Sequence, residues 1–407
     1  MMMKPRPLMS GPLFDNPAKN NGNYSQAGSG GMMNRMPFQS PRPANLMEMT
    51  HQHTTFDLHQ YQNEVPFPYM NESPDDLTDA LIQRNKELIP PIEENSAILN
   101  FVTKVQSVLD TLVLSAASFT ACVLEETRQV GSFKAGTLLV GHKEADIVVI
   151  LKTLPTKEAI GQLGNKLNDD VTKICTPNEA SSSTYLITML VTTYGIEMCM
   201  NDIKVKLLVT TSTKNINSLV PNVHLDKNIC LQHLAAIRHA KWLEENASHP
   251  SIKVLIRLIK DLRRRFEAFQ PLTAWMISLL AHHCVMNNPT HEPLPINTAF
   301  RRSIQLLSAG IFLPNSSGLV DPCNTDRNSR LHDPVAQDEL CLTSQLLLRI
   351  MAHKGYNYIL GVDIHPNLLN EISIWQKDSN LNASVRPGEK VYLKTSDSTN
   401  ETELIHD

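Results

Sequence analysis

The strings VGSF at residues 130–133 and DIVV at residues 146–149 decide the fold of this chain. A weakly alternating run over 119–130 leads into the first string, and a dense β-branched run over 146–151 begins with the second. Both runs are typical of strands, because β-branched side chains pack well on a pleated surface. The sequence therefore predicts a strand, a Gly-Ser turn, a loop and a second strand that opens on Asp146.

This layout resembles the nucleotidyltransferase superfamily. In that superfamily the glycine lets the backbone approach a nucleoside triphosphate closely, and the serine hydroxyl binds phosphate oxygens. The resemblance implies that Gly131 and Ser132 contact phosphate here. It also implies two carboxylates on the second strand with one residue between them. Alternation places both on one face of the strand, where they hold two magnesium ions.

The set of acids expected for catalysis is incomplete. With Asp146 as the first acid, the second position holds Val148, which cannot bind magnesium. A third acid is expected on a later strand, which presents Lys204 and Lys206 instead and has Asp202 just before it. One carboxylate beside two lysines cannot hold two divalent ions. The sequence therefore predicts a pseudo-enzyme with no catalytic residues and no metal site, lacking two of the three catalytic carboxylates.

A basic stripe follows the predicted helix 251–266. Lys253, Arg257, Lys260 and Arg264 recur at helical spacing, so they share one face. The helix resembles the one by which oligoadenylate synthetases hold the phosphates of ATP, which implies that Arg257 and Lys260 bind phosphate. The alternative is a solvated helix face. On the first interpretation the chain binds a nucleoside triphosphate weakly and requires no cofactor.

Composition divides the chain into four segments. Residues 1–72 are rich in Met, Asn, Pro, Gly, Ser and Gln and are predicted to be disordered, as is the polar segment 379–407. Residues 73–220 mix strands with helices, and residues 221–378 are almost wholly helical. The predicted fold class is α+β, with a nucleotidyltransferase-like mixed-sheet lobe followed by an all-helical lobe. Helices are predicted over 156–171, 227–246, 251–266, 273–287, 297–309 and 336–353, and strands over 119–130, 146–151 and 203–210.

Charge, cysteine content and the length of the apolar runs exclude several classes of protein. The net charge of −4 does not suit a globally basic nucleic-acid-binding protein. The seven cysteines show no C-x-x-C spacing, which argues against a disulfide framework or a zinc motif. The longest clean apolar run, 147–151, is far too short to span a bilayer, so no membrane association is expected.

Further strings are similar to the interleukin enhancer-binding factors, members of the DZF-domain family, over about residues 64–375. The strings are ETRQVGS (126–132), AAIRHAKW (235–242), EENA (244–247), MNNPT (286–290) and AGIFLP (309–314). The resemblance implies a heterodimer with a larger DZF protein that carries double-stranded-RNA-binding domains. It implies RNA contact mostly through that partner, with DNA as a further target. It also implies roles in RNA metabolism and transcription and a nuclear location, with the nucleolus and cytoplasm as further locations.

The predicted helix 336–353 is apolar nearly all round, which suggests burial on more than one side. A lone chain would expose part of this surface, and large exposed apolar patches mark binding sites. We therefore predict that Leu342, Leu346 and Ile350 contact the partner. The alternative is that these residues fill the core of their own lobe.

Two other functions remain open from the sequence. One is an active template-independent nucleotidyltransferase that uses Asp146 with a displaced acid such as Asp202. The other is a stand-alone DNA-binding transcription factor. The sequence contains no helix-turn-helix, zinc-finger or basic-zipper pattern in support of the latter.

Overall fold

The structure, a computed structural model, describes residues 74–115, 119–175, 186–314, 316–323, 328–329, 331, 333–352 and 355–362. The segments predicted to be disordered, 1–72 and 379–407, lie outside the described residues. Within the described part, a mixed sheet is followed along the chain by helices, which confirms the predicted α+β class.

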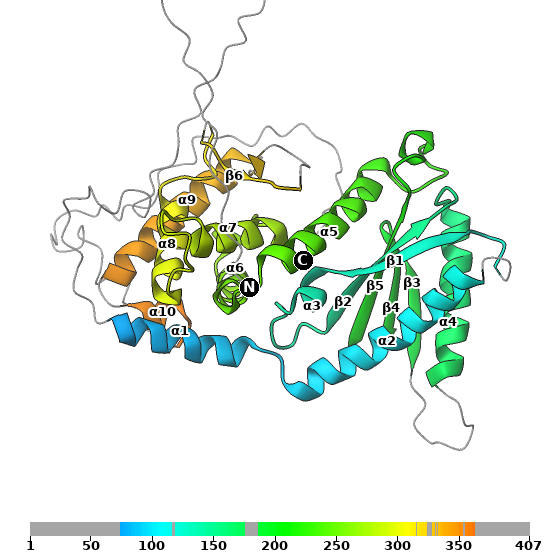
Figure 1. Cartoon of the computed structure of the whole chain (residues 1–407), viewed down its shortest axis with the longest axis horizontal. Helices are drawn as coiled ribbons and strands as arrows, with labels where there is room; N and C mark the ends of the chain where they lie inside the picture. Colours follow the sequence, from blue (N-terminus) through cyan, green and yellow to red (C-terminus); the bar gives the residue numbers. More distant parts are fainter. Residues whose placement is uncertain are drawn as a thin grey trace, which may run out of the picture. The chain divides into compact units, whose positions relative to one another are not determined.

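A five-stranded sheet with the order β1-β2-β5-β4-β3 forms the first half of this fold (Figure 1). Its strands are β1 (Leu124–Val130), β2 (Glu144–Leu151), β3 (Ile187–Val191), β4 (Gly195–Met200) and β5 (Ile203–Thr211). β2 and β5 pair in parallel, whereas the other neighbours are antiparallel. The parallel pairing places Asp146 directly beside Lys206, near the end where both strands begin.

Helices cover both faces of the sheet. α2 (Ile92–Leu114) and α4 (Lys157–Cys175) pack on one face, and α5 (Lys227–Asn246) crosses the other (Figure 1). α2 is long and apolar enough to cross a membrane by length and composition alone. Core helices of soluble proteins meet the same criteria, and one side of α2 is buried in the core of the sheet lobe.

The second half of the fold is a helical cluster centred on α6 (Pro250–Arg265). The sequence fixes the start of α6 with His249, whose side chain caps the helix, and with proline at its first position. Ile252, Leu255 and Ile259 recur at helical spacing and are fully buried. The surrounding elements are α7 (Ala274–Met286), α8 (Ile296–Ser308), α9 (Pro334–Ala352), α10 (Tyr356–Ile359) and the hairpin β6 (Leu319–Val320) and β7 (Asn328–Ser329).

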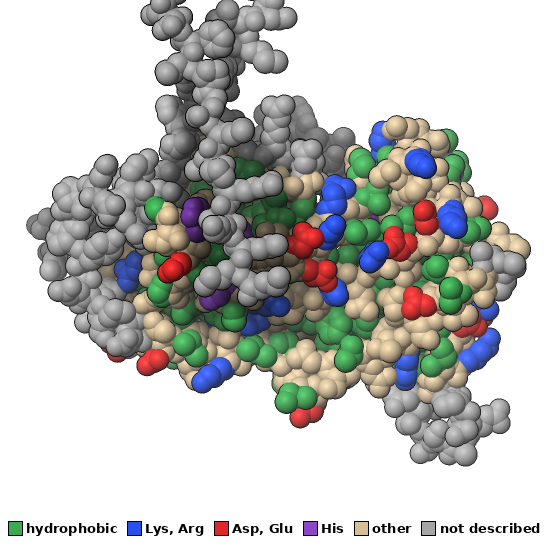
Figure 2. Space-filling model, viewed as in Figure 1, with side chains coloured by type: hydrophobic (Ala, Val, Ile, Leu, Met, Phe, Trp, Pro, Cys, Tyr) green, Lys and Arg blue, Asp and Glu red, His purple; other side chains and the backbone are tan. Residues whose placement is uncertain are grey.

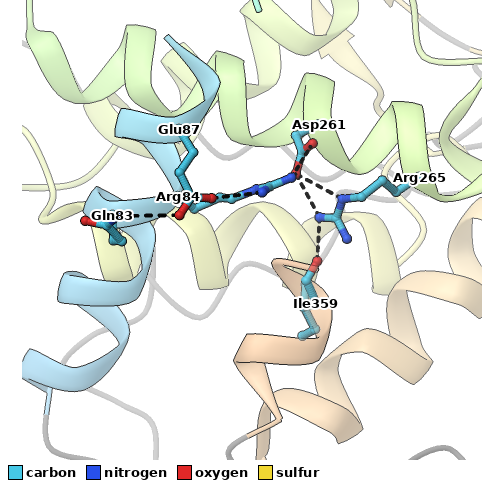
Figure 3. Close-up of polar contacts among 6 residues, drawn as sticks. All are labelled: Gln83, Arg84, Glu87, Asp261, Arg265 and Ile359. Atoms are coloured by element: carbon cyan, nitrogen blue, oxygen red, sulfur yellow. Dashed lines mark hydrogen bonds and ion pairs between the residues drawn. The ribbon is translucent and has the colours of Figure 1, made fainter. Parts of the chain in front are cut away.

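α1 (Pro74–Leu88) packs with the helical cluster through Leu77, Leu81 and Leu88, although the sequence placed it with the mixed lobe. A buried ion network fixes it there (Figure 3). Arg84 of α1 contacts the carboxylate of Asp261 at 3.1 Å. Arg265 contacts the same carboxylate at 2.9 Å and donates to the carbonyl of Ile359 in α10 at 2.6 Å. Asp261 therefore ties α1 to α6, and Arg265, which Asp261 holds, ties α10 to the same helix.

The five predicted C-terminal helices each begin and end within two residues of the observed bounds. The predicted strand 119–130 is shorter, since β1 begins at Leu124. β3 and β4 were not predicted from the sequence. β3 is one of the two edge strands of the sheet. It exposes Leu190 and Val191, and its sequence lacks the apolar and polar alternation of a half-buried strand.

Arg302 of α8 is completely buried and closes the C-terminal end of α7. Its guanidinium donates to the carbonyls of His283 at 3.2 Å, Cys284 at 3.1 Å and Asn287 at 2.6 Å. Carbonyls in the last turn of a helix lack intrahelical partners and lie at the negative end of the helix dipole. One buried cation therefore bonds three carbonyls at the C-terminal end of α7, of which that of His283 also accepts from the Asn287 N–H.

We predict that Arg302→Met lowers the free energy of unfolding by about 3 kcal/mol or more, because it removes three hydrogen bonds to a buried charged group, and such bonds contribute about 1.5–3 kcal/mol each. Denaturant unfolding of the full chain measures this change. The control is Arg349→Met, at an exposed position of α9, which should change stability by no more than about 0.5 kcal/mol. Equal effects of the two substitutions would show that Arg302 is not a structural cap.

Candidate nucleotide-binding site

The Gly-Ser turn lies where β1 ends and the short helix α3 (Gly131–Ala135) begins. Gly131 has a φ of +74°, and a Cβ atom there would collide with the carboxylate of Asp146. Both constraints require glycine. The turn therefore approaches Asp146 closely.

Lys260 of α6 joins the helical cluster to this turn. Its Nζ donates to Ser132 Oγ at 2.6 Å, to the Thr137 carbonyl at 3.2 Å and to Thr137 Oγ1 at 3.3 Å. Burial lowers the pKa of Lys260 to about 8, and Arg263 adds to the decrease, whereas Asp146 opposes it. The structure thus brings together the predicted site residues Gly131, Ser132, Asp146 and Lys260.

Arg257, the fifth predicted site residue, lies one turn earlier on α6 and makes different contacts. Its Nε donates to Asn85 Oδ1 at 2.8 Å, and its Nη1 donates to the Gly136 carbonyl at 2.8 Å. These bonds link α1, α6 and the end of α3. The described contacts of Arg257 are therefore structural, and any phosphate contact would have to be made in addition to them.

The second carboxylate of the site is Glu144, which we did not identify from the sequence. Glu144, Asp146 and Val148 share one face of β2 by alternation, but Val148 is completely buried. Glu144 and Asp146 therefore form the pair with one residue between them, and the predicted pair of Asp146 with Val148 is wrong. The string Glu144-Ala145-Asp146 carried this signal. The statement that two of three carboxylates are missing is corrected to one.

Lysines of β5 neutralise this acid pair. Lys206 Nζ lies 2.6 Å from Glu144 Oε2, and Lys204 Nζ lies 3.4 Å from Glu144 Oε1. Burial alone would raise the pKa of Glu144, but the two lysines outweigh it and hold the pKa below its usual range. Burial raises the pKa of Asp146 to about 6, although Lys206 and Lys260 oppose the increase.

The residues present do not fit a pair of magnesium ions. Lys206 stands opposite Asp146, at the position where the superfamily resemblance implies a third carboxylate. Lys204 is also shared with Glu197, at 3.2 Å. Asp202, the displaced acid considered from the sequence, is exposed and forms an ion pair with Lys143. Ammonium groups rather than carboxylates therefore line the β5 side of the site, and such groups repel divalent cations.

Two adjoining cavities of about 130 Å³ and about 110 Å³ share Ser132 and Lys260 in their walls. Arg263 and Arg264 line the larger cavity. The smaller one has an aromatic wall in which the rings of His239 and Trp275 stack, with centroids 3.9 Å apart. A cationic cavity beside an aromatic one suits a phosphate chain and a planar base.

The three residues predicted to contact a partner divide into two groups. Leu342 and Leu346 of α9 are 49% and 36% exposed. Ile350 is completely buried in the helical cluster, so it belongs to the core of the chain itself and offers no exposed surface. The prediction for Ile350 is therefore corrected, because an all-round apolar helix does not reveal which side its own lobe covers.

Comparison with known proteins places these features in a family. The sequence matches the DZF N-terminal domain over residues 35–248 and the DZF C-terminal domain over residues 251–379. Among solved structures, this chain is similar to CdnC of E. coli MS115-1 in complex with HORMA-deltaN. The sequence identity is 14%, the TM-score is 0.48, and the match covers 74% of this chain and 95% of that chain. A cytoplasmic RNA terminal U-transferase is 10% identical with a TM-score of 0.44, covering 73% and 97%. Cid1 bound to its short product ApU is 11% identical with a TM-score of 0.44, covering 69% and 95%. The two domain matches span most of the sequence, and this chain belongs to the DZF family.

Proposed function

We propose that this chain is a DZF subunit that does not transfer nucleotides. The observation that carries the proposal is the binding of Glu144 by Lys204 and Lys206 where a metal-binding carboxylate cluster is expected. Two-metal catalysis needs a net negative charge facing the cations. The lysines remove that charge, so a metal ion would have to displace an ammonium group before it could bind.

We further propose that the cavities at Ser132 and Lys260 bind a nucleoside triphosphate weakly. Lys260 is available to an anion because its described partners, Ser132 Oγ and the backbone and hydroxyl of Thr137, are all uncharged. Arg263 and Arg264 add positive charge to the same cavity wall. No cofactor is required for this binding.

For the biological role we propose a heterodimer with a larger DZF protein that carries double-stranded-RNA-binding domains. The strings that resemble the interleukin enhancer-binding factors favour the smaller of these factors as the counterpart. On this proposal the complex acts in RNA metabolism and transcription in the nucleus, with RNA held mostly by the partner. The face in Figure 2 supports indirect contact with RNA, because acidic and basic side chains of the described residues are interspersed on it and form no continuous basic patch there.

An active nucleotidyltransferase is the second candidate, and one observation favours it. Glu144 and Asp146 retain the acid pair of β2, so a single substitution on β5 separates this site from three carboxylates. The stand-alone DNA-binding alternative gains no comparable support, because the net charge is −4.

We predict that the purified chain transfers no nucleotide to RNA, DNA or nucleotide acceptors with magnesium or manganese. Wild type should also bind manganese too weakly to detect by calorimetry. Lys206→Asp should create measurable manganese binding, because it places a third carboxylate beside Asp146 and frees Glu144 from its closest cation. Lys241→Asp, at an exposed position of α5, is the matched control and should bind no manganese. Metal-dependent transfer by wild type that disappears in Asp146→Ala would instead establish the active enzyme.

We predict that Lys260→Ala weakens triphosphate binding about tenfold or more, since a charge-assisted hydrogen bond contributes about 1.5–3 kcal/mol. An anion binds the protonated lysine, and the pKa of Lys260 is about 8. Affinity should therefore be full below about pH 7 and fall as the pH rises through about 8. Calorimetry across this range measures both effects. Lys241→Ala is the control, and an unchanged affinity in Lys260→Ala would show that Lys260 has a structural role only.

We predict that Leu342→Asp combined with Leu346→Asp abolishes a one-to-one complex with a larger DZF partner. Both side chains are exposed, so the double variant should fold normally, whereas truncation of α9 would remove residues of the core. Size-exclusion chromatography with light scattering measures the complex, and circular dichroism checks the fold. Leu190→Asp, which changes an exposed leucine on β3, should leave pairing intact. Loss of pairing in the control alone would place the interface on the sheet lobe.

A further inference from the structure

A second cluster of polar side chains lies behind the aromatic wall of the smaller cavity. His239 comes from α5, and Asp321 and Cys323 follow β6. One potential ligand atom from each of the three residues lies within 4.8 Å of the other two. Asp321 is buried, and His239 and Cys323 are partly buried. The cluster shares no residue with the acid and lysine cluster on β2 and β5.

The ring of His239 is held by stacking, and one of its nitrogens has no hydrogen-bond partner among the described residues. Its ring stacks on Trp275 with an interplanar angle of 9°. Its Nε2 atom is buried and has no hydrogen-bond partner among the described residues. Burial lowers the pKa of His239 to about 4, so the imidazole is neutral at physiological pH and offers a lone pair. A buried nitrogen without a partner is costly in a protein interior and points to a ligand.

Asp321 and Cys323 are presented to His239 by one tight turn. The backbone N–H of Cys323 donates to Asp321 Oδ1 at 2.8 Å, which fixes the carboxylate beside the backbone of Cys323. Burial and the neighbouring carboxylate raise the pKa of Cys323. A cation between the two groups would remove that penalty, since metal binding stabilises a thiolate.

We propose that His239, Asp321 and Cys323 form a zinc site. Imidazole nitrogen, thiolate sulfur and carboxylate oxygen are the three ligand types that zinc takes in proteins. Magnesium and calcium prefer oxygen ligands alone, so this set selects against them. Ligand atoms around a tetrahedral zinc ion lie about 3.3–3.8 Å apart, so side-chain shifts of about 1 Å complete the geometry. On binding, the Cys323 thiol gives up its proton to solvent, and water fills the fourth position.

The zinc site would clamp the chain after β6 onto α5. Because His239 also stacks on Trp275, the metal would fix the aromatic wall of the cavity that holds Ser132 and Lys260. The isolated sequence did not reveal the site. Asp321 and Cys323 are close in the chain, but His239 precedes them by about eighty residues, so only the fold brings the three together.

The test uses the full chain, stripped with a chelator and reloaded with zinc or cobalt. We expect about one metal ion per chain by elemental analysis and a thiolate-to-cobalt charge-transfer band in the cobalt form. His239→Phe, which keeps an aromatic ring for stacking, should reduce bound zinc at least tenfold. Cys323→Ser should abolish the charge-transfer band, and Asp321→Asn should weaken zinc binding. A chelator should lower the melting temperature of wild type but not of His239→Phe.

Two control substitutions sharpen the result. Cys341→Ser changes another partly buried cysteine, on α9, and His282→Phe changes a histidine that packs against Trp242. Both should retain the metal and the cobalt band. The proposal is overturned if wild type binds no more zinc than His239→Phe, or if the cobalt band persists in Cys323→Ser. In that event the three side chains form only an internal polar contact.

Discussion

The burial of the Lys260 ammonium between the two halves of the fold is the constraint on which the site depends. Its Nζ reaches Ser132 and Thr137 beside the sheet, from a helix whose other side is packed in the helical core. A buried ammonium must keep its acceptors, because an unpaired buried charge is strongly destabilising. Lys260, together with the bonds of Arg257 to Asn85 and Gly136, therefore holds helix α6 against the turn at Gly131.

The next residue of α6 extends this constraint. Successive helical residues point about 100° apart, so Lys260 faces the Gly-Ser turn while Asp261 faces α1 and holds Arg265, which donates to α10. One turn of helix thus connects the sheet lobe, the N-terminal helix and the end of the described chain. The fold alone accounts for a lysine at this position, so triphosphate binding is an additional property that needs its own measurement.

Much of the architecture could be predicted from the sequence, because amphipathic helices and buried β-branched strands leave clear periodic patterns. The wrong predictions have a common cause. The periodicity of apolar residues in one element does not specify which other elements pack against it. Asp146 could be the first or the second acid of an alternating pair, and the burial of Val148 in the structure supports Glu144 as its companion, which the string Glu144-Ala145-Asp146 already indicated. Ile350 and Leu346 lie on the same apolar helix. Only the packing of that helix against the helical core shows that Ile350 is buried and Leu346 is exposed. The cluster around His239 depends wholly on tertiary contact.

The corrected register changes the physical explanation for the proposed loss of catalysis. On the proposed function β2 keeps both of its acids, and the defect lies on β5, where Lys206 stands in place of the expected carboxylate and differs from it in charge by two units. Two unit charges about 4 Å apart interact by about 4 kcal/mol near a protein surface. A change of two charge units beside Asp146 therefore turns attraction of a divalent cation into repulsion. It leaves the Gly131 turn and Lys260 untouched, because the turn has its own backbone conformation and Lys260 donates to Ser132 and Thr137 rather than to the acid pair. A DZF subunit can therefore retain the shape of a nucleotide site while losing the metal ions that the reaction requires.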